Sequence, residues 1–441
     1  MMPPKARKHH QGLLPDVLSY LPDNIIDVVL LCLPCKDAVR TSILSKKWRY
    51  RWCRLTELTL DWSLWQTKKD LLNPSTKFTK IIYQLLTLHE GPITKFTLDI
   101  VHLESCPDID NFICFLSRSG IQHLVLHLPL RKIYKLPSSL FACSQLRHLS
   151  LCYCSIHHSP SFQGFDKLIS LAISEVEISS ELLESLISHC PLLERLELDI
   201  EDNSDTIEIN APMLRLFDLT GNISSICLKN VPRLVKLLLH GDYITAEELD
   251  FAKVFKYCPA LEHLLFNFHT SEFYAGEGYE VPTRLPFNLN SVKRFYLSDI
   301  MLVKSYKLSY ALCLIRSFPY LEYLEIQVHY DYEYEDEDED DDPIPEPLEL
   351  EDFSDVTFNH LKEVKLGYFT GPTSELLLIK FLLAESPVLE RMIIDRHFLD
   401  YEDIDTRLQI FAEISNFWRA SPKAEIVYID LSKSRSLIYK L

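Results

Sequence analysis

The sequence predicts an α/β chain in which a small three-helix N-terminal module precedes a solenoid of parallel strands and return helices. Two observations predict this arrangement. Leucine accounts for 74 of the 441 residues, and short leucine-centred patterns recur at intervals of 20–27 residues between residues 121 and 261. Residues 21–48 lack that repeat and instead carry apolar residues at helical spacing.

The clearest repeat unit runs from Leu146 to Cys154 and matches L-x-x-L-x-L-x-x-[NC] at every fixed position. The segment from Leu214 to Asn222 matches it with Phe217 in place of one leucine. Both pattern and spacing are typical of leucine-rich repeats, which run ~20–29 residues. Shorter cores begin at Ile121, Leu168, Leu193, Leu234 and Leu261, later units at Val292, Leu321, Leu361 and Leu389, and degenerate opening units at Leu55 and Ile93.

Four units share a proline two residues before their leading apolar residue, namely Pro191, Pro259, Pro319 and Pro387. Because proline cannot continue a helix and biases its predecessor to extended geometry, each predicts a helix end, a turn and a strand. The helix expected before Pro259 begins at a capping box, Thr245–Glu248, and its apolar face holds Phe251, Val254, Phe255 and Cys258. Such a strand-and-helix unit buries its apolar side only by stacking on its neighbours.

The N-terminal module begins with a helix on whose apolar face lie Ile26, Leu30 and Leu33. Asp23 is the expected N-cap of this helix, and Pro34 ends it.

A second helical face begins at Val39 and Ile43, and Trp48 and Trp52 stand one turn apart among basic residues. Three helices this short bury little surface alone, so we expect the module to pack against its own solenoid or a partner.

The run from Leu21 to Trp52 closely resembles an F-box without a gap, and Lys36–Ser42 is similar to the plant form of that motif. The C-terminal part resembles the FBD region that follows leucine-rich repeats in one plant family, in residues 358–366, 382–390 and 420–426. Together with the repeats, the resemblance to plant F-box/FBD/LRR-repeat proteins covers nearly the whole chain.

The resemblance implies that the F-box docks on a Skp-type adaptor, which joins a cullin and a RING protein into an SCF ubiquitin ligase. The repeat and FBD regions would then capture a target protein, and the chain would be a non-enzymatic receptor without a cofactor. Asp27 departs from the family pattern, since many F-boxes carry an apolar residue there, and the helical face places it toward solvent. The positions that match adaptor-contacting or supporting apolar residues of the family are Leu21, Pro22, Ile25, Leu33, Val39, Leu44 and Trp48.

The domain organisation follows from these patterns. Ten of the twelve residues from Asp331 to Asp342 are acidic and three prolines follow, so residues 331–350 are expected to form a disordered insert between repeat units. The expected parts are a flexible basic N-terminus (1–12), the F-box (13–54), the solenoid (55–350), an FBD region that continues it (351–430) and a tail (431–441).

Several functional classes are disfavoured. GxxxxGK[ST], GxGxxG, GxSxG and HExxH motifs are absent, which argues against nucleotide enzymes and common hydrolases. Residues 331–355 hold 15 acidic and no basic residues, so they account for most of the net charge of −18, and all other residues together carry only −3. Because a nucleic-acid binder needs a broad basic surface, we expect no nucleic-acid partner. No run approaches the ~18 apolar residues of a membrane span.

The 12 cysteines are scattered, and we expect reduced thiols in the nucleus or the cytoplasm. Cys32 and Cys35 have C-x-x-C spacing, but they straddle the end of the first F-box helix without a second pair nearby. We therefore interpret this pair as structural rather than metal-binding or redox-active.

Strand alternation predicts which side chains line the concave surface, where solenoids usually bind partners. The candidate substrate-binding residues are His123, His127, His148, Cys152, Arg195 and Glu197, and the strip continues through Lys236, Leu238, His240, His263, Leu265 and Asn267. Stacking of equivalent positions should bring His123 beside His148 and His127 beside Cys152. These are ligand types that zinc prefers, but the two columns are expected about two residues, ~7 Å, apart, which is long for one tetrahedral centre. The sequence therefore favours a polar recognition patch and no metal site.

Two alternatives compete with a substrate receptor. One is a repeat-based scaffold or inhibitor that does not act through a ubiquitin ligase and whose F-box is vestigial. The other is an enzyme, such as a metal-dependent hydrolase built on the histidines and cysteines, which the missing motifs disfavour.

Overall fold

The computed structural model describes residues 17–64, 74–157, 164–200, 206–241, 255–267, 285, 288–300, 302, 305–328, 357–395, 399 and 404–430. The chain divides into two compact units, Met1–Phe165 and Asp166–Leu441. The expected tails (1–12 and 431–441), the acidic insert (331–350), the capping box (245–248), Phe251 and Val254 lie outside the described residues.

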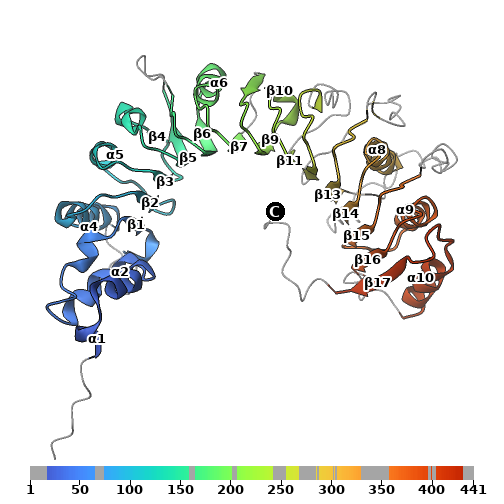
Figure 1. The fold of residues 1–441 in the computed structure, drawn as a ribbon, viewed down its shortest axis with the longest axis horizontal. Helices are drawn as coiled ribbons and strands as arrows, with labels where there is room; N and C mark the ends of the chain where they lie inside the picture. The colour runs from blue at the N-terminus through green and yellow to red at the C-terminus, as the bar shows by residue number, and fades with distance from the viewer. Residues whose placement is uncertain are drawn as a thin grey trace, which may run out of the picture. The chain divides into compact units, whose positions relative to one another are not determined.

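The first unit joins the N-terminal helices to the opening repeats (Figure 1). Strands β1, β2, β3 and β5 form a parallel sheet in this order, with the short β4 beside β5, and the helices α4 and α5 lie on one face of that sheet. The elements are α1 (Val17–Tyr20), α2 (Asp23–Leu31), α3 (Cys35–Arg40), η1 (Thr41–Ile43), η2 (Arg51–Arg54), β1 (Glu57–Leu60), η3 (Trp62–Leu64), α4 (Pro74–Leu88), β2 (Lys95–Asp99), α5 (Ile109–Arg118), β3 (His123–His127), β4 (Tyr134–Lys135), η4 (Ser138–Ala142) and β5 (His148–Ser155).

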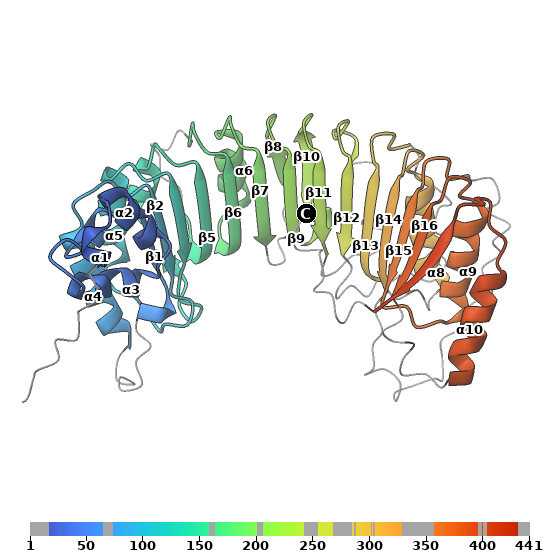
Figure 2. The same ribbon diagram turned by 60° about the horizontal axis from the view of Figure 1, so that its bottom comes forward.

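The second unit carries a parallel sheet in the order β6-β7-β9-β11-β12-β13-β14-β15-β16-β17 (Figure 2). Its helices again lie on one face of the sheet. The elements are β6 (Ser170–Glu177), α6 (Ser180–Ser188), β7 (Arg195–Ile200), β8 (Ile207–Asn210), β9 (Leu216–Gly221), η5 (Ile223–Ser225), β10 (Ile226–Asn230), β11 (Lys236–His240), β12 (His263–Asn267), β13 (Arg294–Ile300), α8 (Ser305–Arg316), β14 (Tyr323–Val328), β15 (Glu363–Gly367), α9 (Thr373–Ala384), β16 (Arg391–Asp395), α10 (Ile404–Asn416) and β17 (Glu425–Ile429).

The predicted repeat is confirmed in both units, because each strand begins two residues after the leading apolar residue of its pattern. Leu146, for example, precedes β5 at His148, and Leu149 and Leu151 within that strand are buried toward the helices. Strand pairing keeps these positions in register, so that Leu149 lies beside Leu124 of β3. Each repeat thus adds one layer to the apolar core of the compact unit that contains it.

The predicted turns also form. Helices α6, α8 and α9 end shortly before Pro191, Pro319 and Pro387, and a turn leads from each proline into the next strand. Of the helix expected before Pro259, the described residues Phe255 and Cys258 are both buried, as the predicted face requires.

A left-handed residue recurs at one position of the repeat. The sixth residue counted from the strand start has a positive φ in five units, at Tyr153, Glu175, Gly221, Asp299 and Tyr368. At Gly221, with φ +127°, a Cβ atom would lie 2.2 Å from the carbonyl oxygen of Ile200 on the neighbouring strand β7. Only glycine fits this position, whereas the other four residues tolerate a milder left-handed turn.

Three details of the N-terminal module differ from the prediction. Leu33 does not lie on the helical face of Ile26 and Leu30, because α2 ends at Leu31, and Leu33 is partly exposed. The N-cap of α2 is Pro22, and Asp23 is the first helical residue without a capping hydrogen bond, because its carboxylate pairs with Lys47 and Arg51 instead. Val39 and Ile43 do not share a buried helical face: α3 ends at Arg40, the chain tightens into the 3₁₀ turn η1, and Ile43 points into solvent.

The sequence reading also missed a separate parallel pair, β8 with β10, in which Ile207 lies beside Ile226. This pair lies on the helix side of the second unit, where β8 contacts α6 and β10 is seen beyond α6 on the outer side of the sheet (Figure 1). None of the helices within the described ranges combines the length and apolarity needed to cross a membrane.

Candidate functional site

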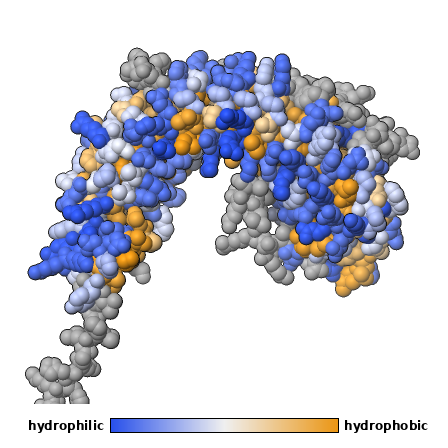
Figure 3. Space-filling view, viewed as in Figure 1, coloured by the Kyte–Doolittle hydropathy of each residue, from blue (hydrophilic) through white to orange (hydrophobic). Residues whose placement is uncertain are grey.

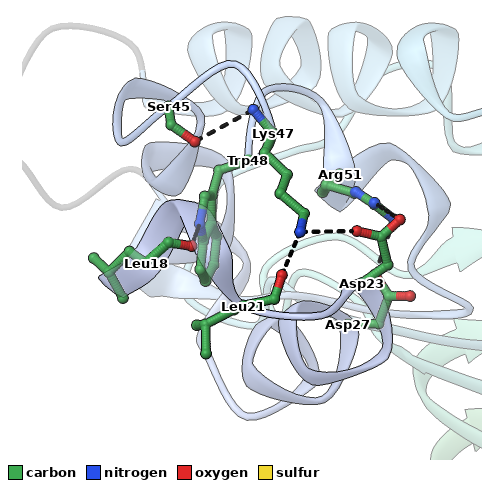
Figure 4. Close-up of polar contacts among 8 residues, drawn as sticks. All are labelled: Leu18, Leu21, Asp23, Asp27, Ser45, Lys47, Trp48 and Arg51. Atoms are coloured by element: carbon green, nitrogen blue, oxygen red, sulfur yellow. Dashed lines mark hydrogen bonds and ion pairs between the residues drawn. The ribbon is translucent and has the colours of Figure 1, made fainter. Parts of the chain in front are cut away.

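The N-terminal module is built around a small apolar core. Ile26 and Leu30 of α2, Ala38 of α3 and Trp48 are buried. The indole Nε1 of Trp48 donates a hydrogen bond of 2.9 Å to the carbonyl oxygen of Leu18 (Figure 4). This bond ties the loop after η1 to α1, so that one side chain joins two segments of the module that are 30 residues apart in the chain.

A polar cluster fixes the start of α2 (Figure 4). The Nζ atom of Lys47 donates to the carbonyl oxygen of Leu21 and lies 3.4 Å from Oδ1 of Asp23, while Arg51 pairs with Oδ2 of the same carboxylate. The hydrogen bond from Arg51 is the main reason that the pKa of Asp23 lies below its usual value, with Lys47 acting in the same direction. Asp27, the departure from the family pattern, is solvent-exposed as predicted and lies 3.8 Å from Arg51.

The module rests against the first strand of its own unit. The Nζ atom of Lys36 on α3 donates to the carbonyl oxygen of Ser63 at 2.9 Å, and Ser63 belongs to η3 directly after β1. The pKa of Cys35 at the start of α3 is raised to about 11, mainly by burial, so this thiol stays protonated near neutral pH. Such a thiol is a poor nucleophile, which agrees with a structural interpretation of Cys32 and Cys35.

The predicted adaptor-contact residues fall into three groups. Pro22, Ile25 and Leu44 are exposed, Leu21, Leu33 and Val39 are partly exposed, and Trp48 is buried and supports the others from inside. Seven further exposed apolar side chains of the module were not among the predicted contact residues: Leu18, Tyr20, Val28, Val29, Leu31, Ile43 and Tyr50.

Ile43 is the most exposed of these residues at 87%, and Leu44 beside it is 47% exposed. Figure 3 shows apolar surface over this N-terminal module. We call the exposed residues Ile25, Val28, Leu31, Ile43 and Leu44 the F-box apolar surface. Exposed apolar side chains gathered on one module mark a surface that a partner covers.

A second candidate site is the face of each sheet that carries no helices, here called the open face. In the first unit its predicted columns are confirmed: His123 pairs in register with His148, and His127 with Cys152. The rings of His123 and His148 stack with centroids 4.2 Å apart at an interplanar angle of 12°. Burial, with a smaller contribution from the charge of Lys95, lowers the pKa of His123.

The predicted spacing of these columns was wrong. His123 and His127 are four residues apart on β3 rather than two, which is ~13 Å along a strand. That distance exceeds what one tetrahedral zinc ion spans. Among the residues that the structure describes, no group of three or more His, Cys, Asp or Glu side chains is arranged to hold a metal ion.

In the second unit, Arg195 and Glu197 lie exposed on β7 of the open face. Although Glu197 is exposed at the surface, partial desolvation of its carboxylate among its neighbours raises its pKa, and the carboxylate of Asp218 acts in the same direction. Asp218 itself lies 3.3 Å from Nε2 of His240, and Oγ of Ser174 donates to Asp199 at 2.7 Å. The predicted candidates thus belong to a face of alternating charges and hydrogen bonds.

Further along this open face is a polar network that the sequence reading missed. The carboxylate of Glu325 on β14 accepts a 2.6 Å hydrogen bond from the hydroxyl of Tyr323 and lies 2.7 Å from Nζ of Lys365 on β15. Gln327 donates to the same carboxylate at 3.3 Å. Burial and this bond to Glu325 raise the pKa of Tyr323. Strand alternation applied to the units at Leu321 and Leu361 would have placed these side chains together.

The comparisons with known proteins agree with this architecture. Residues 18–58 match the F-box domain, and residues 109–326 match the family described as "FBD-associated F-box protein At5g56370, LRR repeats". The F-box/FBD/LRR-repeat protein At1g13570 of Arabidopsis thaliana is 34% identical over 426 residues, which cover 95% of this chain and 99% of that protein.

Two further Arabidopsis thaliana proteins match part of the chain. The F-box/LRR-repeat protein At4g14103 is 34% identical over 196 residues, which cover 42% of this chain and 49% of that protein. The F-box/FBD/LRR-repeat protein At5g56420 is 29% identical over 212 residues, which cover 46% of this chain and 49% of that protein. The alignment thus spans about half the length of each of these two relatives.

Proposed function

Because this chain belongs to the F-box/FBD/LRR-repeat protein family, we propose that it is the substrate-recognition subunit of an SCF-type ubiquitin ligase. Its F-box would bind a Skp-type adaptor and through it a cullin and a RING protein. Its repeat and FBD regions would capture a target protein. We further propose that it works in the nucleus or the cytoplasm.

The observation that carries this proposal is the F-box apolar surface. An isolated domain gains nothing from holding Ile43 and Leu44 in water, and burying a large aliphatic side chain contributes ~1.5–3 kcal/mol. The buried Trp48 and the cluster around Asp23 hold the helices that present these residues, so the surface is formed before a partner arrives. Preformed apolar side chains on a rigid module are what an adaptor needs for stable docking.

The proposed mechanism is positional. A receptor of this kind holds its target close to an activated ubiquitin and raises the effective concentration of the two reactants, while its own side chains take no part in the bond-forming step. The stacked repeats suit that role, because repeats that pack on their neighbours form the extended binding surface on which a target can be held.

The test is the affinity of the purified full chain for a recombinant plant Skp-type adaptor. We expect Ile43→Ser/Leu44→Ser to weaken binding about 100-fold, since the two side chains together contribute roughly 3 kcal/mol when buried. Leu21→Ala/Pro22→Ala should also abolish adaptor pull-down and leave the circular dichroism unchanged. Trp418→Ser removes a side chain that is 70% exposed in the second unit and should change the affinity less than twofold.

The outcomes separate the candidate functions. Adaptor binding that survives the Ile43→Ser/Leu44→Ser substitution would refute the assignment of the F-box apolar surface. A wild-type chain that is folded and does not bind the adaptor would favour the alternative, a repeat-based scaffold or inhibitor outside the ubiquitin ligase.

A further inference from the structure

Three neighbouring strands of the second unit carry a row of basic residues on the open face. Lys236 of β11, His263 of β12 and Arg294 of β13 are paired in register, so their side chains stand side by side at ~4.8 Å intervals. We call them the basic row. Among the described residues, no carboxylate forms an ion pair with Lys236 or Arg294.

Other cations nearby are already neutralised. Lys293 lies 2.9 Å from Glu262, Lys362 lies 3.0 Å from Glu322, and Lys365 lies 2.7 Å from Glu325. The basic row therefore differs from its surroundings in lacking a counter-charge. Burial and the charges of Lys236 and Arg294 lower the pKa of His263, with a smaller contribution from Lys293, and Glu262 opposes this shift.

A shallow apolar depression lies directly beside the basic row. It is lined by Leu238, Leu265 and Tyr296, which are again paired in register across β11, β12 and β13, and by Lys236 and His263. Leu265 forms its buried floor. Leu238, Leu265 and Tyr296 stand two residues beyond the basic row along their strands, which is ~7 Å.

Two residues of β12, one on either side of Leu265 along the strand, carry a buried polar atom without a hydrogen bond to any described residue. Nδ1 of His263 and Oδ1 of Asn267 are both inaccessible to solvent, and neither forms a hydrogen bond within the described part of the chain. A buried polar atom without a partner costs about 1–3 kcal/mol. Of these two residues, only His263 lines the depression.

We propose that β11, β12 and β13 bind an extended segment of the target protein in which an acidic residue stands two positions from a large apolar residue. The ~7 Å between the basic row and the depression equals the separation of side chains i and i+2 in an extended chain. The carboxylate meets the basic row, and the apolar side chain packs over Leu238 and Leu265 at the surface of the depression. This inference rests on the proposed function for its meaning as target recognition.

A peptide fits this face better than a nucleic acid. The carboxylates of Glu197, Asp218 and Glu325 lie on the same open face and would repel a continuous phosphodiester backbone. A peptide places a single carboxylate at the basic row and an uncharged side chain beside it, which avoids that repulsion.

The test is binding of the full chain to an array of twelve-residue peptides in a Ser/Gly background. One set carries Glu and Leu two positions apart, and matched sets carry Gln and Leu, Lys and Leu, or Glu and Ser at those positions. We expect selective retention of the Glu and Leu set. The variant Lys236→Gln/Arg294→Gln should bind this set about tenfold more weakly, because each charge contributes up to ~1 kcal/mol.

The matched control is Lys293→Gln/Lys362→Gln, which removes the same charge from lysines that already have carboxylate partners and should change binding less than twofold. Leu238→Ser should weaken the binding of Glu and Leu peptides and leave thermal stability nearly unchanged. Equal binding by the two double variants, or equal retention of the Lys and Leu set, would refute the proposal. Binding of a twelve-nucleotide single strand to the basic row, in the absence of any peptide binding, would also refute the proposal.

Adaptor affinity measured on the same variants keeps this inference separate from the proposed function. Both double variants should bind the Skp-type adaptor like the wild type. If the wild type captures the Glu and Leu peptides and not the adaptor, the proposed function fails while the peptide-binding surface stands.

Discussion

Removing the charge of Lys365 should lower the stability of the protein strongly, because its ion pair with Glu325 is mostly buried. The side chain of Glu325 is 7% exposed and that of Lys365 is 18% exposed, with 2.7 Å between Oε1 and Nζ. The variant Lys365→Met keeps most of the aliphatic stem and removes the charge. Breaking a buried pair by removing one partner costs about 3–5 kcal/mol, because the other charge stays desolvated.

Two neutral donors reduce this cost. Tyr323 and Gln327 still donate to the carboxylate of Glu325 in the variant, so we expect a loss of ~3 kcal/mol, at the lower end of that range. The double variant Glu325→Gln/Lys365→Met removes the unpaired charge and should recover most of the loss. A control is Lys362→Met, directly before β15. Its pair with Glu322 spans 3.0 Å, the two side chains are 55% and 44% exposed, and the variant should lose at most ~1 kcal/mol.

The assay is thermal unfolding of the full chain followed by far-UV circular dichroism at pH 7. Because an array of repeats need not unfold in one step, the midpoint of the transition is compared among the variants rather than converted into a single free energy. Equal lowering of the midpoint by Lys365→Met and Lys362→Met would show that burial does not set the cost of removing the charge. A double variant less stable than Lys365→Met would show that the unpaired charge of Glu325 is not the cause of the loss.

Three further predictions concern single residues of the first unit. Ile26→Ala should destabilise the F-box by about 2–5 kcal/mol, because the side chain of Ile26 is buried. Ile25→Ala should weaken adaptor binding and change the stability by less than ~0.5 kcal/mol, because the side chain of Ile25 is exposed, and equal unfolding curves for the two variants would contradict this. Folding lowers the pKa of Asp23 from its ordinary value of 3.8, so the ionised carboxylate should make the wild type more stable than Asp23→Asn above about pH 4. This difference in stability should vanish as the pH falls through the pKa that Asp23 has in the folded protein, and chemical unfolding at several pH values would show it. His148→Ala should expose the ring of His123 and raise its pKa toward 6.5 in an NMR titration, and an unchanged value would show that the stack does not bury it.

The repeat could be predicted because one physical constraint recurs in every unit. Residues at L-x-x-L-x-L spacing must face the helices for the sheet to bury its apolar side, and this fixes both the strand start and the register of equivalent positions. The neighbours His123 and His148 follow directly from that register. The same rule would have located Glu325 beside Lys365, although 40 residues separate them in the chain.

The remaining features depend on partners that the local sequence does not specify. Asp23 has a good capping side chain, but Lys47 and Arg51 return from the far end of the module and attract its carboxylate. Because the chain changes from an α-helix to a 3₁₀ turn at Thr41, Ile43 points outward and no longer shares a helical face with Val39. The strands β8 and β10 are too short, at 4 and 5 residues, for their alternation to stand out from the surrounding repeat.

The most direct test of the central claim is the amount of cullin that the full chain recovers by immunoprecipitation from plant cells. We predict that the wild type recovers the Skp-type adaptor, the cullin and the RING protein together. Ile43→Ser/Leu44→Ser should lose at least nine-tenths of all three, and Trp418→Ser should recover them like the wild type. Cullin recovered equally by the wild type and by Ile43→Ser/Leu44→Ser, or absent from a wild-type sample that contains the adaptor, would contradict the account.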